Sequence, residues 1–208
     1  MTLINEKHNY VYIHVYKVAG QTVKLALRQH DLRRVPLIRD QIAKLVELEQ
    51  AYTFRSYQAH STASQIRDFL GQEKWDSMFT FSFVRNPWDW QVSLYHFIQI
   101  NKFNYQRRMV SEMTFDEYIR WRVEEDVHLQ RDFIYDRHGN QLVDFVGKIE
   151  SLHDDFAKVC DRIGIDASLG HENSSKHDAW RSYYTDETAA LIADAYRDDI
   201  ETFGYSFE

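Results

Sequence analysis

The sequence is short of the residues that form disulfides and turns. It contains one cysteine, Cys160, two prolines and seven glycines in 208 residues. A lone cysteine forms no internal disulfide, which is typical of a reducing compartment, and we expect a cytoplasmic protein. So few glycines and prolines argue against disordered linkers and turn-rich all-β folds. The length is that of one domain, and we expect a single domain over residues 1–208.

Long apolar runs and an excess of basic residues are also missing. The longest candidate stretch, Phe79–Val84, has six residues and includes Thr80 and Ser82, whereas a membrane span requires roughly 18 apolar residues. The first ten residues are mixed and polar, unlike a signal peptide. Lys and Arg number 25 against 32 Asp and Glu, a formal net charge of −7. We therefore expect no nucleic-acid and no membrane partner, and the oligomeric state stays open.

The sequence does have hydrophobic residues, 44% of the total, which is enough for a sizeable core. Short β-like runs alternate with helical patterns, and this favours an α/β sheet over a helical bundle or a β-sandwich. Runs of β-branched and aromatic residues predict four strands: Tyr10–Tyr16, Tyr52–Tyr57, Phe79–Val84 and Leu142–Ile149.

Helix start signals stand between and after the predicted strands. Gln65 and Glu117 each complete a capping box with a threonine three residues earlier, and Pro87 is suited to the first position of a helix. The predicted helices are a run over Val23–Gln29 and helices that begin at Thr62, Asn86, Thr114, Ser151 and Thr185. We expect the last helix to run unbroken to Phe203, with its apolar residues on one stripe.

Polar residues follow three of the predicted strands at the point where each strand ends. The loop Lys17–Thr22 follows the first strand, His60 the second, and Arg85 the third, with Ser93 eight residues further on. In open α/β sheets the ligand binds outside the carboxyl ends of the strands. We therefore expect these residues to contribute to one ligand site.

The loop Lys17–Thr22 has the composition of an anion site. A strand, a short turn with Gly20 and a helix start present backbone N–H groups and the positive end of a helix dipole. Lys17 adds a positive charge and Thr22 a hydroxyl, although the G-x-x-x-x-G-K-[ST] pattern is absent. An ordinary βα turn with a surface lysine is an equally good interpretation of this loop alone.

Arg85 and Ser93 form a second candidate anion site. Arginine presents a fork of donors that suits a phosphate, and the serine hydroxyl adds another donor. The alternative interpretation is an arginine paired with an acidic neighbour and a serine on a solvated face.

Several segments together resemble a known family. The segments YVYIHVYKVAGQTV and FTFSFVRNPWDWQVSLYHF are similar to the 5′-phosphosulfate-binding and 3′-phosphate-binding segments of sulfotransferases. The stretches HSTASQIRDFLGQEKWDSMF, VDFVGKIESLHDDF and HENSSKHDAWRSYYTDETAALIADAYRDDIETFGYSF resemble the carbohydrate-type and bacterial branch of that family. The resemblance covers most of the chain in the right order, and the Arg85 segment is its most specific part.

The resemblance implies a three-layer, P-loop-like α/β fold with a central, mostly parallel sheet flanked by helices. It implies the cofactor 3′-phosphoadenosine 5′-phosphosulfate (PAPS) and the product adenosine 3′,5′-bisphosphate (PAP). Arg85 and Ser93 would bind the 3′-phosphate. The 5′-phosphosulfate would be bound by Lys17, Val18, Ala19, Gly20, Gln21 and Thr22.

The implied reaction is in-line transfer of a sulfuryl group to a hydroxyl or amine of a small-molecule or sugar acceptor. Lys17 would neutralise charge on the 5′-phosphate leaving group. His60 is our candidate general base, because an imidazole has a suitable pKa, and His96 is the second choice. The polar loop 171–177 is a candidate for closing over the cofactor or the acceptor.

Three positions depart from the family pattern: Tyr16, Gln21 and Trp90 stand where proline, a hydroxyl residue and arginine are usual. Two alternatives therefore stay open, a small-molecule kinase that uses ATP and a non-catalytic nucleotide-binding protein. No pair of residues has convincing zinc spacing, and we expect no metal. The aromatic residues Trp88, Trp90, Tyr95 and Phe97 are expected to pack in the core or between helices, and which residue stacks on adenine stays open.

Overall fold

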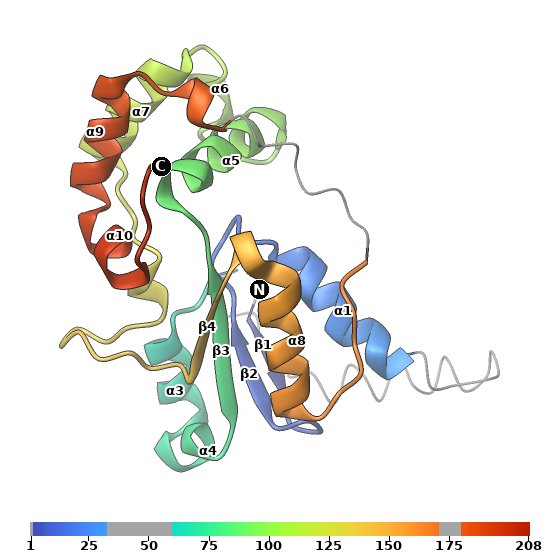
Figure 1. Ribbon diagram of the computed structural model, residues 1–208. Coiled ribbons are helices and arrows are strands. Elements are labelled where there is room, and N and C mark those ends of the chain that lie inside the picture. The colour runs from blue at the N-terminus through green and yellow to red at the C-terminus, as the bar shows by residue number, and fades with distance from the viewer. Residues whose placement is uncertain (1, 33–59, 171–179) are drawn as a thin grey trace. The chain divides into compact units, whose positions relative to one another are not determined.

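The computed structural model describes residues 2–32, 60–170 and 180–208 (Figure 1). The first of its two compact units takes its described residues from 1–84 and 132–172, and the second from 85–131 and 173–208. The predicted strand Tyr52–Tyr57 and the loop 171–177 lie outside the described residues. No described helix is both long and apolar enough to cross a membrane.

The first unit contains a four-stranded, mostly parallel sheet. Its strands are β1 (Leu3–Asn5), β2 (Tyr10–Ile13), β3 (Phe79–Val84) and β4 (Phe145–Lys148), in the spatial order β1-β2-β3-β4. β1 is antiparallel to β2, whereas β2, β3 and β4 are parallel to one another. The mixed α/β class predicted from the sequence is confirmed.

Two strands, β2 and β4, are shorter than predicted. β3 has the predicted bounds, but β2 ends at Ile13 rather than at Tyr16. The residues after Ile13 lead into a turn, in which Lys17 has a φ of 62° instead of extended backbone. β4 starts three residues later than predicted because the backbone N–H of Leu142 is bonded to Ile134 instead of to the sheet. The short edge strand β1 was not predicted.

The core of this unit is aromatic, and one glycine is needed for its packing. The rings of Tyr12 and Phe81 stack with centroids 5.1 Å apart. Helix α8 (Leu152–Ile163) packs on β3 and β4 and lies in front of the sheet in Figure 1. A Cβ atom at Gly147 would lie 2.5 Å from the Phe83 ring and 3.1 Å from Cβ of Asp155, so only glycine allows this close approach.

The remaining helices of the first unit are α1 (Gly20–Leu32), α3 (Ala63–Leu70) and α4 (Gln72–Asp76). The predicted capping box of α3 is confirmed, since Thr62 and Gln65 each accept the backbone N–H of the other. Helix α8 begins next to Ser151 as predicted, after a 3₁₀ turn over Ile149–Ser151. The Ser151 hydroxyl donates to Asp155 and caps nothing.

The second unit is helical. It contains α5 (Pro87–Ile100), α6 (Arg107–Val110), α7 (Phe115–Glu125), α9 (Asp186–Ala195) and α10 (Arg197–Phe203). Its helix starts at Asn86, Thr114 and Thr185 are confirmed, each with a side-chain cap.

The prediction of one unbroken C-terminal helix is wrong. Tyr196 has φ −110° and ψ 21°, and it separates α9 from α10. Its side chain is fully buried, with the ring 6.1 Å from that of Trp90. The chain therefore leaves helical geometry at the residue whose aromatic ring fills the core of this unit.

Candidate functional site

The loop after β2 has an unusual backbone. Lys17 and Ala19 both have positive φ, 62° and 52°, although neither is glycine. This conformation costs an L-residue on the order of 1 kcal/mol or more, and such residues cluster at ligand-binding sites. Val18, between them, is fully buried and anchors the loop. Ala19 accepts the first backbone bond of α1, from Val23 at 3.1 Å, so the loop leads directly into a helix start.

Gly20 allows a side chain to approach the start of α1 closely. It is the first residue of α1 and is not the left-handed residue of the turn. A Cβ atom at this position would lie 1.8 Å from Nε2 of His14. Glycine is therefore required because the His14 imidazole occupies the space beside the helix start.

His14 is held as a neutral ring. Burial, reinforced by the nearby positive groups that include His60 and Lys24, lowers its pKa to about 3. Its backbone carbonyl also contacts His60, whose Nδ1 lies 3.3 Å from the His14 oxygen.

The contact with His14 determines which nitrogen of His60 is basic. A carbonyl oxygen only accepts, so Nδ1 of His60 carries the hydrogen and Nε2 of the neutral ring has a lone pair. Burial is also the main cause that lowers the pKa of His60, so the ring is neutral at pH 7. His60 lies close to the start of the Lys17 loop, with its ring centroid 5.6 Å from that of Tyr16.

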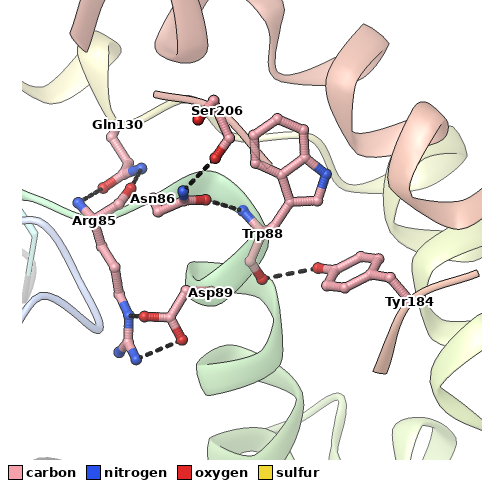
Figure 2. A network of polar contacts seen from close by, with 7 residues as sticks. All are labelled: Arg85, Asn86, Trp88, Asp89, Gln130, Tyr184 and Ser206. Carbon is pink, nitrogen blue, oxygen red and sulfur yellow. Dashed lines mark hydrogen bonds and ion pairs between the residues drawn. The ribbon is translucent and has the colours of Figure 1, made fainter. Parts of the chain in front are cut away.

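Arg85, in the second unit, is held in an ion pair. Its Nε and Nη2 atoms donate to the two carboxylate oxygens of Asp89 at 2.6 and 2.9 Å (Figure 2). Both residues are less than 10% exposed. The sequence-based alternative of an arginine paired with an acidic neighbour therefore describes this contact correctly. The same contact also fixes the direction of the guanidinium along α5.

Ser93 lies one turn beyond Asp89 on the same face of α5, four residues further on. It is 8% exposed and so does not stand on a solvated face. Arg85, Asp89 and Ser93 therefore follow one another along one side of the helix start. On this side of α5, Asp89 thus lies between the Arg85 end of the helix and the Ser93 hydroxyl.

The start of α5 is fastened at three points, as Figure 2 shows. The Asn86 side chain accepts from the N–H of Trp88 at 3.1 Å and donates to the carbonyl of Ser206 at 2.8 Å. The Tyr184 hydroxyl donates to the carbonyl of Trp88 at 2.8 Å. These three hydrogen bonds connect the start of α5 to the C-terminal segment and to Tyr184.

The aromatic residues near these positions pack as predicted. Trp88 lies edge-on to Phe207, and Trp90 is fully buried against Tyr196. His96, the second candidate for a base, has its Nε2 atom 2.9 Å from the Tyr183 hydroxyl.

Three contributors were not identified from the sequence. Asp89 was not named as the partner of Arg85, although its spacing of four residues from Arg85 could have revealed the pair. His14 and Gln130 act through contacts 45 or 46 residues away in the chain, and no local pattern signals these. In the part of the chain that the structure describes, no group of three or more His, Cys, Asp or Glu side chains could bind a metal ion.

Two comparisons relate this chain to known proteins. An uncharacterized protein of Archaeoglobus fulgidus is 29% identical over 118 residues, which is 51% of this chain and 85% of that protein. A model of the sulfotransferase family matches residues 1–206 and so includes both the Lys17 loop and the Arg85 segment. Sulfotransferases are transferases that move sulfuryl groups, and this chain belongs to the sulfotransferase family.

Proposed function

We propose that the protein transfers a sulfuryl group from PAPS to a hydroxyl or amine of a small-molecule or sugar acceptor and releases PAP. The observation that carries the proposal is the buried Arg85 guanidinium, fixed by Asp89 in a segment that matches a sulfotransferase family. A PAPS-dependent enzyme needs a fixed cation for the 3′-phosphate, which distinguishes its cofactor from ATP. The sheet and its phosphate loop are also consistent with a three-layer, P-loop-like fold.

The 5′-phosphosulfate is assigned to the loop after β2. Backbone N–H groups of Val18, Ala19, Gly20 and Gln21 precede or open α1, a 13-residue helix whose positive dipole end favours an anion. Lys17 supplies a charge and Thr22 a hydroxyl. The left-handed residues support this assignment, since such a backbone persists only where the surrounding structure or a ligand requires it.

The 3′-phosphate is assigned to Arg85 and Ser93. The carboxylate of Asp89 contacts Nε and Nη2, so it orients the guanidinium before any ligand arrives. Pre-orientation lowers the entropic cost of binding, although the same carboxylate offsets part of the attraction for a phosphate. Ser93, buried one turn further along α5, offers a hydroxyl donor to the same anion.

His60 and Lys17 are proposed to carry out the transfer. The acceptor oxygen or nitrogen attacks sulfur while the bond from sulfur to the 5′-phosphate oxygen breaks. The acceptor proton passes to Nε2 of His60, which has its lone pair because Nδ1 donates to His14. Lys17 and the loop N–H groups stabilise the charge that builds up on the departing phosphate.

Calorimetric titration with PAP, with ATP–Mg²⁺ and with 5′-AMP tests the proposal. We expect PAP to bind at least tenfold more tightly than 5′-AMP, about 1.4 kcal/mol, because only PAP carries the 3′-phosphate. Labelled PAPS with an acceptor library would then measure transfer. Preference for ATP would support a kinase, and absence of nucleotide binding would contradict the proposal.

A further inference from the structure

We propose that Gln130 is a positioning residue for Arg85, and that it thereby sets the affinity for the 3′-phosphate. This inference rests on the proposed function for its effect on nucleotide binding. The observation behind it is a pair of hydrogen bonds that a single side chain makes to both backbone groups of Arg85.

The carboxamide of Gln130 binds Arg85 as a neighbouring strand would. Its Oε1 accepts the backbone N–H of Arg85 at 2.9 Å, and its Nε2 donates to the backbone carbonyl of Arg85 at 2.7 Å (Figure 2). Gln130 is fully buried. Arg85 directly follows the last residue of β3. Just beyond the end of the strand, the carboxamide provides hydrogen-bond partners for the backbone N–H and C=O of Arg85. The backbone from which the guanidinium extends is therefore fixed on both sides.

Gln130 is itself fixed by a second buried carboxylate. The N–H groups of Gln130 and Arg131 donate to the two oxygens of Asp199 at 2.8 and 2.9 Å. Asp199 is fully buried on α10. The contacts run from Asp199 to the Gln130 backbone, from the Gln130 side chain to the Arg85 backbone, and from the Arg85 side chain to Asp89. The Gln130 amide thus positions the Arg85 backbone, and the Asp89 carboxylate positions its guanidinium.

The chemistry requires a neutral amide at residue 130. A carboxylate would keep the acceptor for the Arg85 N–H but would face the Arg85 carbonyl with a second acceptor. An apolar side chain of the same length would remove both bonds and leave two buried backbone groups without them. Gln130→Glu and Gln130→Met therefore perturb the backbone of Arg85 to different degrees without touching its side chain.

The test compares PAP with 5′-AMP by calorimetry in wild type and in Gln130→Met. We expect the PAP affinity to fall about tenfold and the 5′-AMP affinity to stay within about twofold, so that the preference for the 3′-phosphate is lost. In an Arg85→Ala background the same substitution should have no further effect on PAP binding, because residues that act together are not additive. Gln130→Glu replaces Gln130→Met if the latter does not fold.

Gln141→Met is the matched control. Gln141 is exposed in the first unit, and its carboxamide also makes one donor and one acceptor bond, to the Val143 carbonyl and the Tyr135 hydroxyl. The Gln141→Met substitution should leave the affinities for PAP and for 5′-AMP unchanged. Equal weakening of PAP and 5′-AMP by Gln130→Met, or an unchanged preference for PAP, would overturn the inference.

A second measurement keeps the inference independent of the proposed function. The Arg85 Nε–H resonance reports the ion pair with Asp89 by NMR and needs no nucleotide. We expect Gln130→Met to shift this resonance and Gln141→Met to leave it in place. Wild type that does not prefer PAP would refute the proposed function, whereas an unmoved Arg85 resonance in Gln130→Met would refute the positioning role.

Discussion

The buried imidazole of His14 predicts a specific dependence of stability on pH. Its pKa is lowered from 6.5 to about 3 in the folded chain, chiefly by burial. The unfolded chain therefore takes up this proton first as the pH falls. The contribution of His14 to stability is complete above about pH 6.5 and is lost progressively between about 6.5 and 3.

The magnitude follows from the two pKa values. Each pH unit in that window removes about 1.4 kcal/mol of unfolding free energy, so about 2 kcal/mol is lost between pH 7.5 and 5.0. His14→Gln removes the titrating group while keeping a side chain of similar length beside Gly20. The variant should be less stable than wild type at pH 7.5, and the gap should narrow by about 2 kcal/mol at pH 5.0.

Urea unfolding curves at pH 7.5, 6.5, 5.5 and 5.0 measure this gap directly, because all other titrating groups are common to the two proteins. His153→Gln is the matched control, because the His153 side chain is exposed on α8. Parallel curves of unfolding free energy against pH for wild type and His14→Gln would contradict a lowered pKa of His14 in the folded chain.

Three further outcomes are expected. Arg85→Ala should weaken PAP binding by about 1.5–3 kcal/mol, as for a lost charged hydrogen bond. The control Arg197→Ala removes an exposed Arg–Asp pair and should not weaken PAP binding. Equal effects of the two substitutions in calorimetry would contradict the assignment of the 3′-phosphate to Arg85. His60→Ala should lower turnover by roughly 10²–10⁴-fold and leave PAP affinity intact. In the wild type, the rate should fall on the acid side of the pH profile below pH 6.5, because burial lowers the pKa of His60. Full turnover in His60→Ala would place the base elsewhere. Gly20→Ala should destabilise the protein by about 1–3 kcal/mol in urea unfolding, since its Cβ would overlap the His14 ring, and an unchanged midpoint would contradict the close contact.

Local signals in the sequence determined much of the secondary structure. The capping boxes at Thr62 and Thr114 and the N-cap at Asn86 were identified correctly. The aromatic and β-branched run Phe79–Val84 forms a strand with the predicted bounds. These features depend on residues within three or four positions of one another, so the sequence carries them explicitly.

The sequence also named the candidate residues, but their surroundings came from tertiary contacts. The tautomer of His60 depends on the carbonyl of His14, 46 residues away. The backbone of Arg85 is held by Gln130, 45 residues away, and Gln130 by Asp199, 69 residues away. The break at Tyr196 likewise accompanies the burial of its ring against Trp90.

Composition and spacing therefore determined which residues could bind an anion or move a proton, because those properties belong to the side chains themselves. Folding decided which nitrogen of His60 is basic, where the Arg85 guanidinium points and why position 20 must be glycine. Each of these depends on burial and on hydrogen-bond partners distant in the chain. Such pairings leave no periodic pattern in the sequence, so only the three-dimensional structure reveals them.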